Sequence, residues 1–219
     1  MQKKIKIGVD EAGRWPWAGP VVAAALFFDS INPPSKSFIK KLDDSKKLSE
    51  KKRNELFTEI IEYSRWNKPS IYFWVGVVDS FIIDEINIRQ ANREAMRRAL
   101  IEILRKIKPG SRKHIQVVID GRDNYQFDEL KTQPFYIVGW DGKVSEISAA
   151  SIIAKVFRDK LMHSYASLYP DMNLEHHKWY GTKKHQEYLT DISKVTGLHR
   201  TSFLPIQRLL KIKWKKINK

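Results

Sequence analysis

Residues 5–14, IKIGVDEAGR, combine the pattern of a strand with two adjacent acidic residues. Apolar residues alternate with polar or small ones from Ile5 to Asp10, and this alternation predicts a half-buried strand. Asp10 and Glu11 stand at its end, just before a turn that contains Gly13. Ionised carboxylates are costly beside an apolar core unless a positive charge compensates them, and hard divalent cations prefer carboxylate oxygens. The pair therefore indicates either a solvated turn or part of a metal site.

The chain is strongly basic, with 40 Lys and Arg against 25 Asp and Glu and a formal net charge of +15. Such an excess attracts polyanions, so nucleic acid is the favoured partner and a membrane surface the weaker one. No apolar run approaches the roughly 20 residues that span a bilayer, and we expect no signal peptide. The absence of cysteine excludes disulfides and thiolate metal sites and fits a cytoplasmic location.

Strand and helix patterns alternate along the 219 residues, enough for one large domain or for one domain with a helical appendage. The predicted strands are Ile5–Asp10, Val21–Phe28, Ile71–Val78, Ile115–Asp120 and Tyr136–Trp140. The predicted helices are Ser49–Ser64, Ile88–Ile107 and Ser145–Leu168. This order favours an α/β or α+β sheet with helices packed on it. The chain ends in the basic segment RLLKIKWKKINK, which is typical of a solvated helix face or of a phosphate contact.

Two further acids stand where predicted strands end, each followed by glycine: Asp120 after IQVVI and Asp141 after YIVGW. Each alone is typical of an Asp-Gly turn. Together they place acids at the edge where open α/β sheets bind ligands. Converging carboxylates repel one another, and two divalent cations about 4 Å apart compensate them while clamping both oxygens of an in-line phosphoryl displacement. With the basic composition, the pattern indicates metal-dependent phosphodiester hydrolysis.

Seven blocks in chain order carry a family resemblance: VDEAGR, PWAGPVVAAA, DDSKKLSEKKR, DEINIRQANREAMRRAL, VVIDG, SEISAASIIAKVFRDK and YGTKKH. They resemble ribonuclease HII, the type 2 ribonuclease H family, from about residue 5 to about residue 205. The resemblance implies an α/β, RNase H-like fold: a mixed β-sheet flanked by helices over residues 1–170, with a basic helical C-terminal extension over residues 171–219 packed on it. It also implies endonucleolytic cleavage of RNA in RNA–DNA hybrids and 5′ of ribonucleotides embedded in duplex DNA, leaving 5′-phosphate and 3′-hydroxyl ends.

The resemblance also assigns the catalytic metal ligands, namely Asp10, Glu11, Asp120 and Asp141. The implied cofactor is Mg²⁺ or Mn²⁺, as two ions. Asp159 is the alternative fourth ligand, but it lies inside a predicted helix, whereas the family pattern places this ligand before ISAAS. Asp44 is interpreted as local turn or substrate-side structure.

Discrimination of RNA from DNA requires detection of the 2′-hydroxyl group. In the resembling family a Gly-Arg-Gly turn presents backbone groups to the junction nucleotide, and a Tyr supports its sugar. The matching positions are Gly13, Arg14, Trp15 and Tyr180. Three lysines in family-like blocks complete the expected substrate-binding set: Lys46, Lys155 and Lys183. Other basic residues are expected on the solvated surface: Lys47, Lys184 and Arg200.

Two tryptophans replace glycines of the family pattern, Trp15 in the turn and Trp179 in KWYGTKKH. Glycine permits positive φ and close backbone approach to a ligand, and Trp does neither readily. Three arrangements remain open. The rings pack on each other, Trp15 stacks on a sugar or base at roughly 1–3 kcal/mol per stacked base, or both rings point outward. The alternative function is a hybrid-binding protein with weakened or altered junction cleavage.

The expected partners are RNA–DNA hybrids and ribonucleotide-containing DNA duplexes, with no membrane, and the protein is expected to be a monomer. Another nuclease of this fold, such as a resolvase or integrase-like enzyme, is disfavoured by the DSKKLS and ISAASIIAKV blocks. Zinc is not expected, because no HExxH spacing or cysteine supports the histidines of the C-terminal part: His176, His177, His185 and His199.

Overall fold

The computed structural model describes residues 4–42, 47–65, 68–137, 144–169 and 179–217. These residues form a five-stranded sheet in the order β3-β2-β1-β4-β5. The strands are β1 Ile5–Ala12, β2 Val21–Phe28, β3 Ile71–Val78, β4 Ile115–Asp120 and β5 Phe135–Ile137. β1 pairs antiparallel with β2 and parallel with β4, while β2–β3 is antiparallel and β4–β5 parallel. The sheet is therefore mixed, as the resemblance implied.

The strand predictions are confirmed for β1 to β4, and β1 continues two residues further, to Ala12, so that Asp10 and Glu11 lie inside it. β5 begins at Phe135, one residue before the predicted start. The rest of that predicted strand, beyond Ile137, lies outside the described residues.

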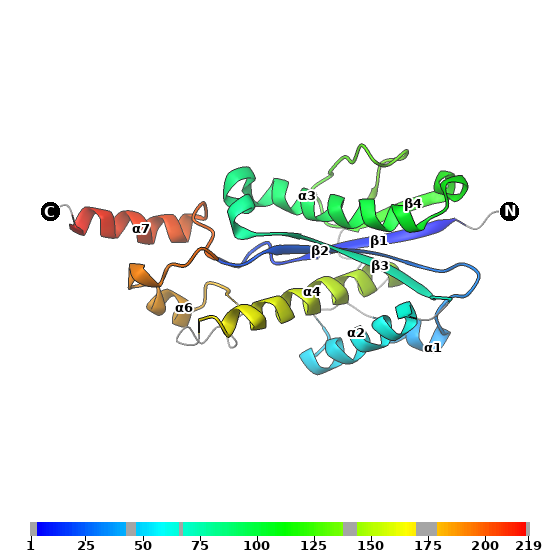
Figure 1. Ribbon diagram of the computed structural model, residues 1–219, viewed down its shortest axis with the longest axis horizontal. Coiled ribbons are helices and arrows are strands. Elements are labelled where there is room, and N and C mark those ends of the chain that lie inside the picture. The colour runs from blue at the N-terminus through cyan, green and yellow to red at the C-terminus, as the bar shows by residue number, and fades with distance from the viewer. Residues whose placement is uncertain (1–3, 43–46, 66–67, 138–143, 170–178, 218–219) are drawn as a thin grey trace.

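Helices cover both faces of the sheet, with α3 on one side and α4 and α2 on the other (Figure 1). The helices are α1 Lys36–Ile39, α2 Glu50–Arg65, α3 Ser80–Lys106, α4 Ser145–Ala166, α6 Lys183–Tyr188 and α7 Leu204–Ile217, with 3-10 turns η1 Pro109–His114 and η3 Ile192–Lys194. This arrangement confirms the α/β class and the helices predicted near α2 and α4.

β2 is buried on both faces because it lies between the two helical layers. Ala23 and Ala25 belong to the core beneath α3, whereas Ala24 and Leu26 belong to the core beneath α4 and α2. Small side chains in this strand let both layers approach the sheet closely, which explains the run of alanines.

α3 is interrupted at Asn87, whose φ of 66° and ψ of 161° are not helical. The Asn87 side chain accepts hydrogen bonds from the backbone N–H groups of Arg89 and Gln90, as an N-cap does. The helix predicted from Ile88 therefore corresponds to the second part of α3, and the turns before Asn87 escaped prediction.

α7 extends from one end of the molecule, beyond the sheet, at the left of Figure 1. The predicted domain boundary at residue 170 falls outside the described residues, and the division into two parts stays a prediction. Within the described part of the chain, no helix has the length and apolar character needed to cross a bilayer.

Candidate active site

Three acidic side chains meet in one pocket of about 230 Å³ where β1 and β4 end. Val9 lies opposite Ile119 in the parallel register of these strands, so Asp10 and Asp120 follow as neighbours at the same edge. The residues around this pocket are Asp10, Glu11, Ala12, Gly13, Arg14, Trp15, Arg53, Asp120, Ser151, Lys155 and Tyr180. The parallel pairing of β1 with β4 thus assembles acids that are more than a hundred residues apart in the sequence.

Glu11 lies in a buried environment that disfavours its charged form. Burial raises the pKa of Glu11 to about 7; Arg14 opposes this change, and the carboxylates of Asp120 and Asp123 add to it. Asp10 is buried as well, and its Oδ1 accepts a hydrogen bond from the Glu11 backbone N–H at 2.8 Å. Ionising all of these carboxylates together therefore requires additional positive charge.

The donor set fits a hard divalent cation, because three carboxylates line one pocket and carboxylate oxygens are the ligands such cations prefer. Among the residues that the structure describes, no group of three or more His, Cys, Asp or Glu side chains is already assembled around one metal position. Asp141, the predicted fourth ligand, lies outside the described residues.

Arg14 lies between two acids at the rim of the pocket. Its Nη1 is 2.6 Å from Asp123 Oδ2 and 3.6 Å from Glu11 Oε1. The Tyr125 hydroxyl donates to the same Asp123 carboxylate at 3.0 Å. The sequence reasoning missed Asp123, for which the only signal was its place shortly after Asp120.

Two buried arginines hold the turn that follows Glu11. Arg158 donates from Nε to the Pro20 carbonyl at 3.1 Å and from Nη2 to the Ala18 carbonyl at 3.2 Å. Arg200, 0% exposed, donates to the carbonyls of Gly13, Arg14 and Gly19. The expectation of a solvated Arg200 is therefore wrong, because backbone carbonyls satisfy its guanidinium inside the protein.

The two tryptophans occupy opposite environments. Trp15 lines the pocket with 79% of its surface exposed, whereas Trp179 is fully buried. Within the described residues, the Trp179 ring contacts Tyr169, His185 and His199, so the two tryptophans do not pack on each other. Trp179 has a φ of 66°, the left-handed conformation that favours the glycine of the family pattern. The outward alternative thus holds for Trp15 alone.

Tyr180 lies beneath two cations, with Lys155 Nζ at 5.8 Å and the Arg158 guanidinium at 5.9 Å from its ring centroid. Lys155 also forms an ion pair with Asp159 at 2.9 Å. Asp159 therefore has a partner on its own helix, which is typical of a structural ion pair.

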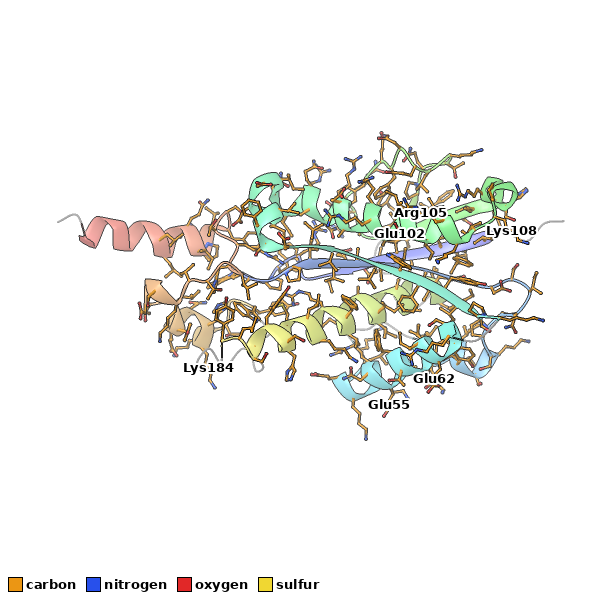
Figure 2. The ribbon with its side chains drawn as sticks, in the orientation of Figure 1. Glu55, Glu62, Glu102, Arg105, Lys108 and Lys184 are labelled. Carbon is orange, nitrogen blue, oxygen red and sulfur yellow. The ribbon has the colours of Figure 1, made fainter. Side chains whose placement is uncertain are left out.

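The remaining predicted substrate residues are less closely placed. Lys183 projects from α6 with its Nζ 4.0 Å from a Glu187 carboxylate oxygen, and it is not among the residues that line the pocket. Lys184 is an exposed residue of α6, as expected for a surface lysine (Figure 2). Lys46 lies outside the described residues.

The sequence reasoning also missed Arg53 of α2 and Ser151 of α4, which both line the pocket. Each belongs to a family-like block, DDSKKLSEKKR and SEISAASIIAKVFRDK, and this was the available signal.

Two of the C-terminal histidines, His185 and His199, form a buried pair rather than a metal site. His185 Nε2 lies 3.1 Å from His199 Nε2, and His185 Nδ1 lies 3.0 Å from the Tyr180 carbonyl oxygen. A bond from His185 Nδ1–H to that carbonyl leaves His185 Nε2 to accept from His199. His176 and His177 lie outside the described residues.

Comparisons with known proteins agree with one another. The sequence model of the ribonuclease HII family matches residues 7–206. Ribonuclease HII of Fusobacterium nucleatum is 43% identical over 204 residues, covering 93% of this chain and 87% of that protein. Ribonuclease HII of Idiomarina loihiensis is 44% identical over 203 residues, covering 93% of this chain and 97% of that protein.

Solved structures share the fold. The crystal structure of ribonuclease H2 from Pyrococcus horikoshii OT3 has a TM-score of 0.72 at 24% identity, covering 96% of this chain and 99% of that one. Bst-RNase HIII in complex with Mn²⁺ has a TM-score of 0.71 at 18% identity, covering 97% of this chain and 71% of that one.

Proposed function

We propose that the pocket where β1 and β4 end is the catalytic centre of this chain, which belongs to the ribonuclease HII family. The chain is an RNase H endonuclease, a hydrolase acting on RNA–DNA hybrids. The observation that carries the proposal is the meeting of Asp10, Glu11 and Asp120 in one pocket with Arg14 and Tyr180. The alternative of a protein that binds hybrids with weakened cleavage has no support from the comparisons.

The proposed cofactor is a pair of divalent cations, Mg²⁺ or Mn²⁺, held by Asp10, Glu11, Asp120 and Asp141. When bound, such ions activate a water for in-line attack and stabilise the leaving 3′-oxygen, so that cleavage leaves 5′-phosphate and 3′-hydroxyl ends. The Mn²⁺ complex of the structurally similar Bst-RNase HIII supports the choice of a divalent cation.

The turn Gly13–Trp15, called the recognition turn below, supplies the proposed contact to the ribose. Its carbonyls at Gly13 and Arg14 accept from Arg200, and the peptide bonds are trans. In a trans peptide the N–H points opposite to the C=O, so the N–H groups of Arg14 and Trp15 point away from Arg200. Both residues line the pocket, where these donors suit the 2′-hydroxyl of a ribonucleotide at a DNA junction.

The basic residues at the rim suit the phosphates on either side of that nucleotide. Arg14 and Lys155 line the pocket, and each is already held by one acid, Asp123 and Asp159 respectively. An arginine held in this way contacts phosphate at a smaller entropic cost than a freely rotating one.

Adding Mg²⁺ to the metal-free protein is expected to raise its unfolding temperature by several degrees. A ligand present at about 100 times its Kd stabilises the folded state by about 2.7 kcal/mol, provided that it binds only that state. Asp10→Asn is expected to remove most of this rise. Asp128→Asn is the matched control, because Asp128 is exposed in the loop of residues 121–134, and it is expected to keep the rise. Differential scanning fluorimetry measures all three, and an equal rise in Asp10→Asn would contradict the proposed site.

Trp15→Gly is expected to raise the KM for a duplex with one ribonucleotide by about tenfold, with kcat changed by less than about twofold. The reason is that the exposed Trp15 ring stands at the pocket rim, where stacking on a base contributes about 1–3 kcal/mol. Steady-state cleavage of matched duplexes with zero, one or four ribonucleotides measures the change.

Trp74→Ala is the matched control, since this indole is also exposed but belongs to β3 and contacts Lys106. It is expected to leave KM unchanged. A Trp15→Gly variant that cuts the single-ribonucleotide duplex better than the parent would show instead that Trp15 obstructs docking.

A further inference from the structure

Arg200 joins the C-terminal part of the chain to the recognition turn by side-chain hydrogen bonds. Its Nη2 donates to the Gly13 carbonyl at 2.6 Å, and its Nη1 donates to the Arg14 carbonyl at 3.0 Å. Nε and Nη2 both donate to the Gly19 carbonyl, at 2.9 and 2.8 Å. One planar guanidinium thus binds two carbonyls of the recognition turn and the carbonyl of Gly19.

The backbone of the same segment adds to this attachment. The Arg200 N–H donates to the Trp17 carbonyl at 2.8 Å, and the Gly19 N–H donates to the Leu198 carbonyl at 2.8 Å. Trp17 in turn donates its N–H to the Trp179 carbonyl at 3.0 Å. The segment that follows the recognition turn is therefore hydrogen-bonded to residues far along the chain.

Arg200 is buried, and within the part of the chain that the structure describes its side chain donates to backbone carbonyls and to no carboxylate. Burial, together with the positive charge of Arg158, lowers the pKa of Arg200 to about 9. A buried cation costs folding free energy unless its donors are satisfied, and here backbone carbonyls satisfy them. An apolar side chain would fill the same space but would not orient the backbone carbonyls. The guanidinium, in contrast, is suited to fixing the direction of those carbonyls.

Asp84 of α3 anchors the residues that follow Arg200. Its Oδ2 accepts from the N–H and hydroxyl of Thr201 at 2.8 and 2.7 Å, and its Oδ1 accepts from the N–H and hydroxyl of Ser202 at 2.9 and 2.6 Å. Burial raises the pKa of Asp84, but these hydrogen bonds outweigh it and leave the pKa below its ordinary value. The carboxylate thus holds the start of the segment before α7 on the body of the protein.

We propose that Arg200 is a positioning residue for ribonucleotide recognition, which holds the carbonyls of the recognition turn inward so that its N–H groups face the substrate, and that Asp84 fixes Arg200 in this role. This inference rests on the proposed function of the turn. Lysine cannot replace the arginine, because a single ammonium group lacks the planar fork that spans three carbonyls.

Arg200→Lys is expected to raise the KM for a single-ribonucleotide duplex at least about tenfold while kcat falls by less than about threefold. In this variant the peptide groups of the recognition turn are free to rotate, so the turn binds the ribose less well and KM rises. The acids of the pocket are unchanged, so kcat changes little. A merely structural role gives the other pattern, since a smaller folded fraction lowers the apparent kcat and leaves KM unchanged. Asp84→Asn keeps Arg200 and is expected to raise KM about threefold.

Arg105→Lys makes the same chemical change at an exposed site on the outward face of α3 and is expected to change neither constant (Figure 2). Unchanged KM in both Arg200→Lys and Asp84→Asn, or a fall in kcat alone, overturns the proposal. The Mg²⁺-induced rise in unfolding temperature is measured on the same variants. Its absence from the parent protein counts against the proposed metal site, whereas its persistence with a raised KM supports the positioning role.

Discussion

Asp10→Asn and Asp120→Asn are each expected to lower cleavage of an RNA–DNA hybrid by at least about 1,000-fold in the presence of Mg²⁺, or about 4 kcal/mol of transition-state stabilisation. Each substitution replaces a carboxylate by a neutral amide of the same size, so the pocket keeps its shape while its charge falls. Asp10 is buried near the end of β1, and Asp120 ends the adjacent parallel strand β4. Cleavage of a labelled hybrid under single-turnover conditions measures the loss.

Asp159→Asn is the matched control for these variants. Its carboxylate already pairs with Lys155 on α4, so its removal is expected to cost less than about tenfold. The same assay applied to Asp141→Asn decides the fourth ligand: a loss close to that of Asp10→Asn assigns the role to Asp141. Parent-like cleavage by Asp10→Asn and Asp120→Asn would refute the proposed catalytic centre.

The sheet could be predicted because its signals are local. The alternation from Ile5 and the apolar run from Val21 to Phe28 each identify a strand without reference to any other part of the chain. The start of α3 could not be predicted in the same way. Its first turns end at Asn87, where a polar side chain both interrupts the helix and caps the next part.

The acids of the site could be predicted from their positions at strand ends, because parallel strands bring those ends together. The residues that hold the neighbouring segment 13–19 in place could not be predicted in this way. An arginine in a basic segment is usually exposed, and nothing near Arg200 in the sequence indicates that its acceptors lie in residues 13–19. Trp179 is a similar case, since its ring is buried in a cluster with Ala18 and Met162, which are distant from it in the sequence.

Gly13→Ala is expected to lower kcat/KM for a single-ribonucleotide duplex by about 100-fold, equivalent to about 2.7 kcal/mol. Gly13 has a φ of 94°, which an L side chain rarely adopts. A Cβ there would also lie 2.3 Å from Arg158 Nε and 2.7 Å from the Pro20 carbonyl oxygen. Arg158 cannot move aside easily, because it is itself bonded to the Ala18 and Pro20 carbonyls.

The recognition turn must therefore shift to admit the methyl group, and that shift reaches the carbonyl that Arg200 holds. Gly121→Ala separates strain from collision, since Gly121 has a φ of 125° but, among the described residues, no atom within 4 Å of an added Cβ. Urea unfolding of both variants is expected to show the larger loss of stability for Gly13→Ala, by about 1–3 kcal/mol for the added collision. Gly110→Ala, which meets neither constraint, is expected to behave like the parent. Only a rigid turn converts one added methyl group into a loss of ribonucleotide recognition. Equal losses of stability in Gly13→Ala and Gly121→Ala, with cleavage retained in Gly13→Ala, would therefore contradict the prediction. They would mean that the recognition turn moves without disturbing the ribose contact.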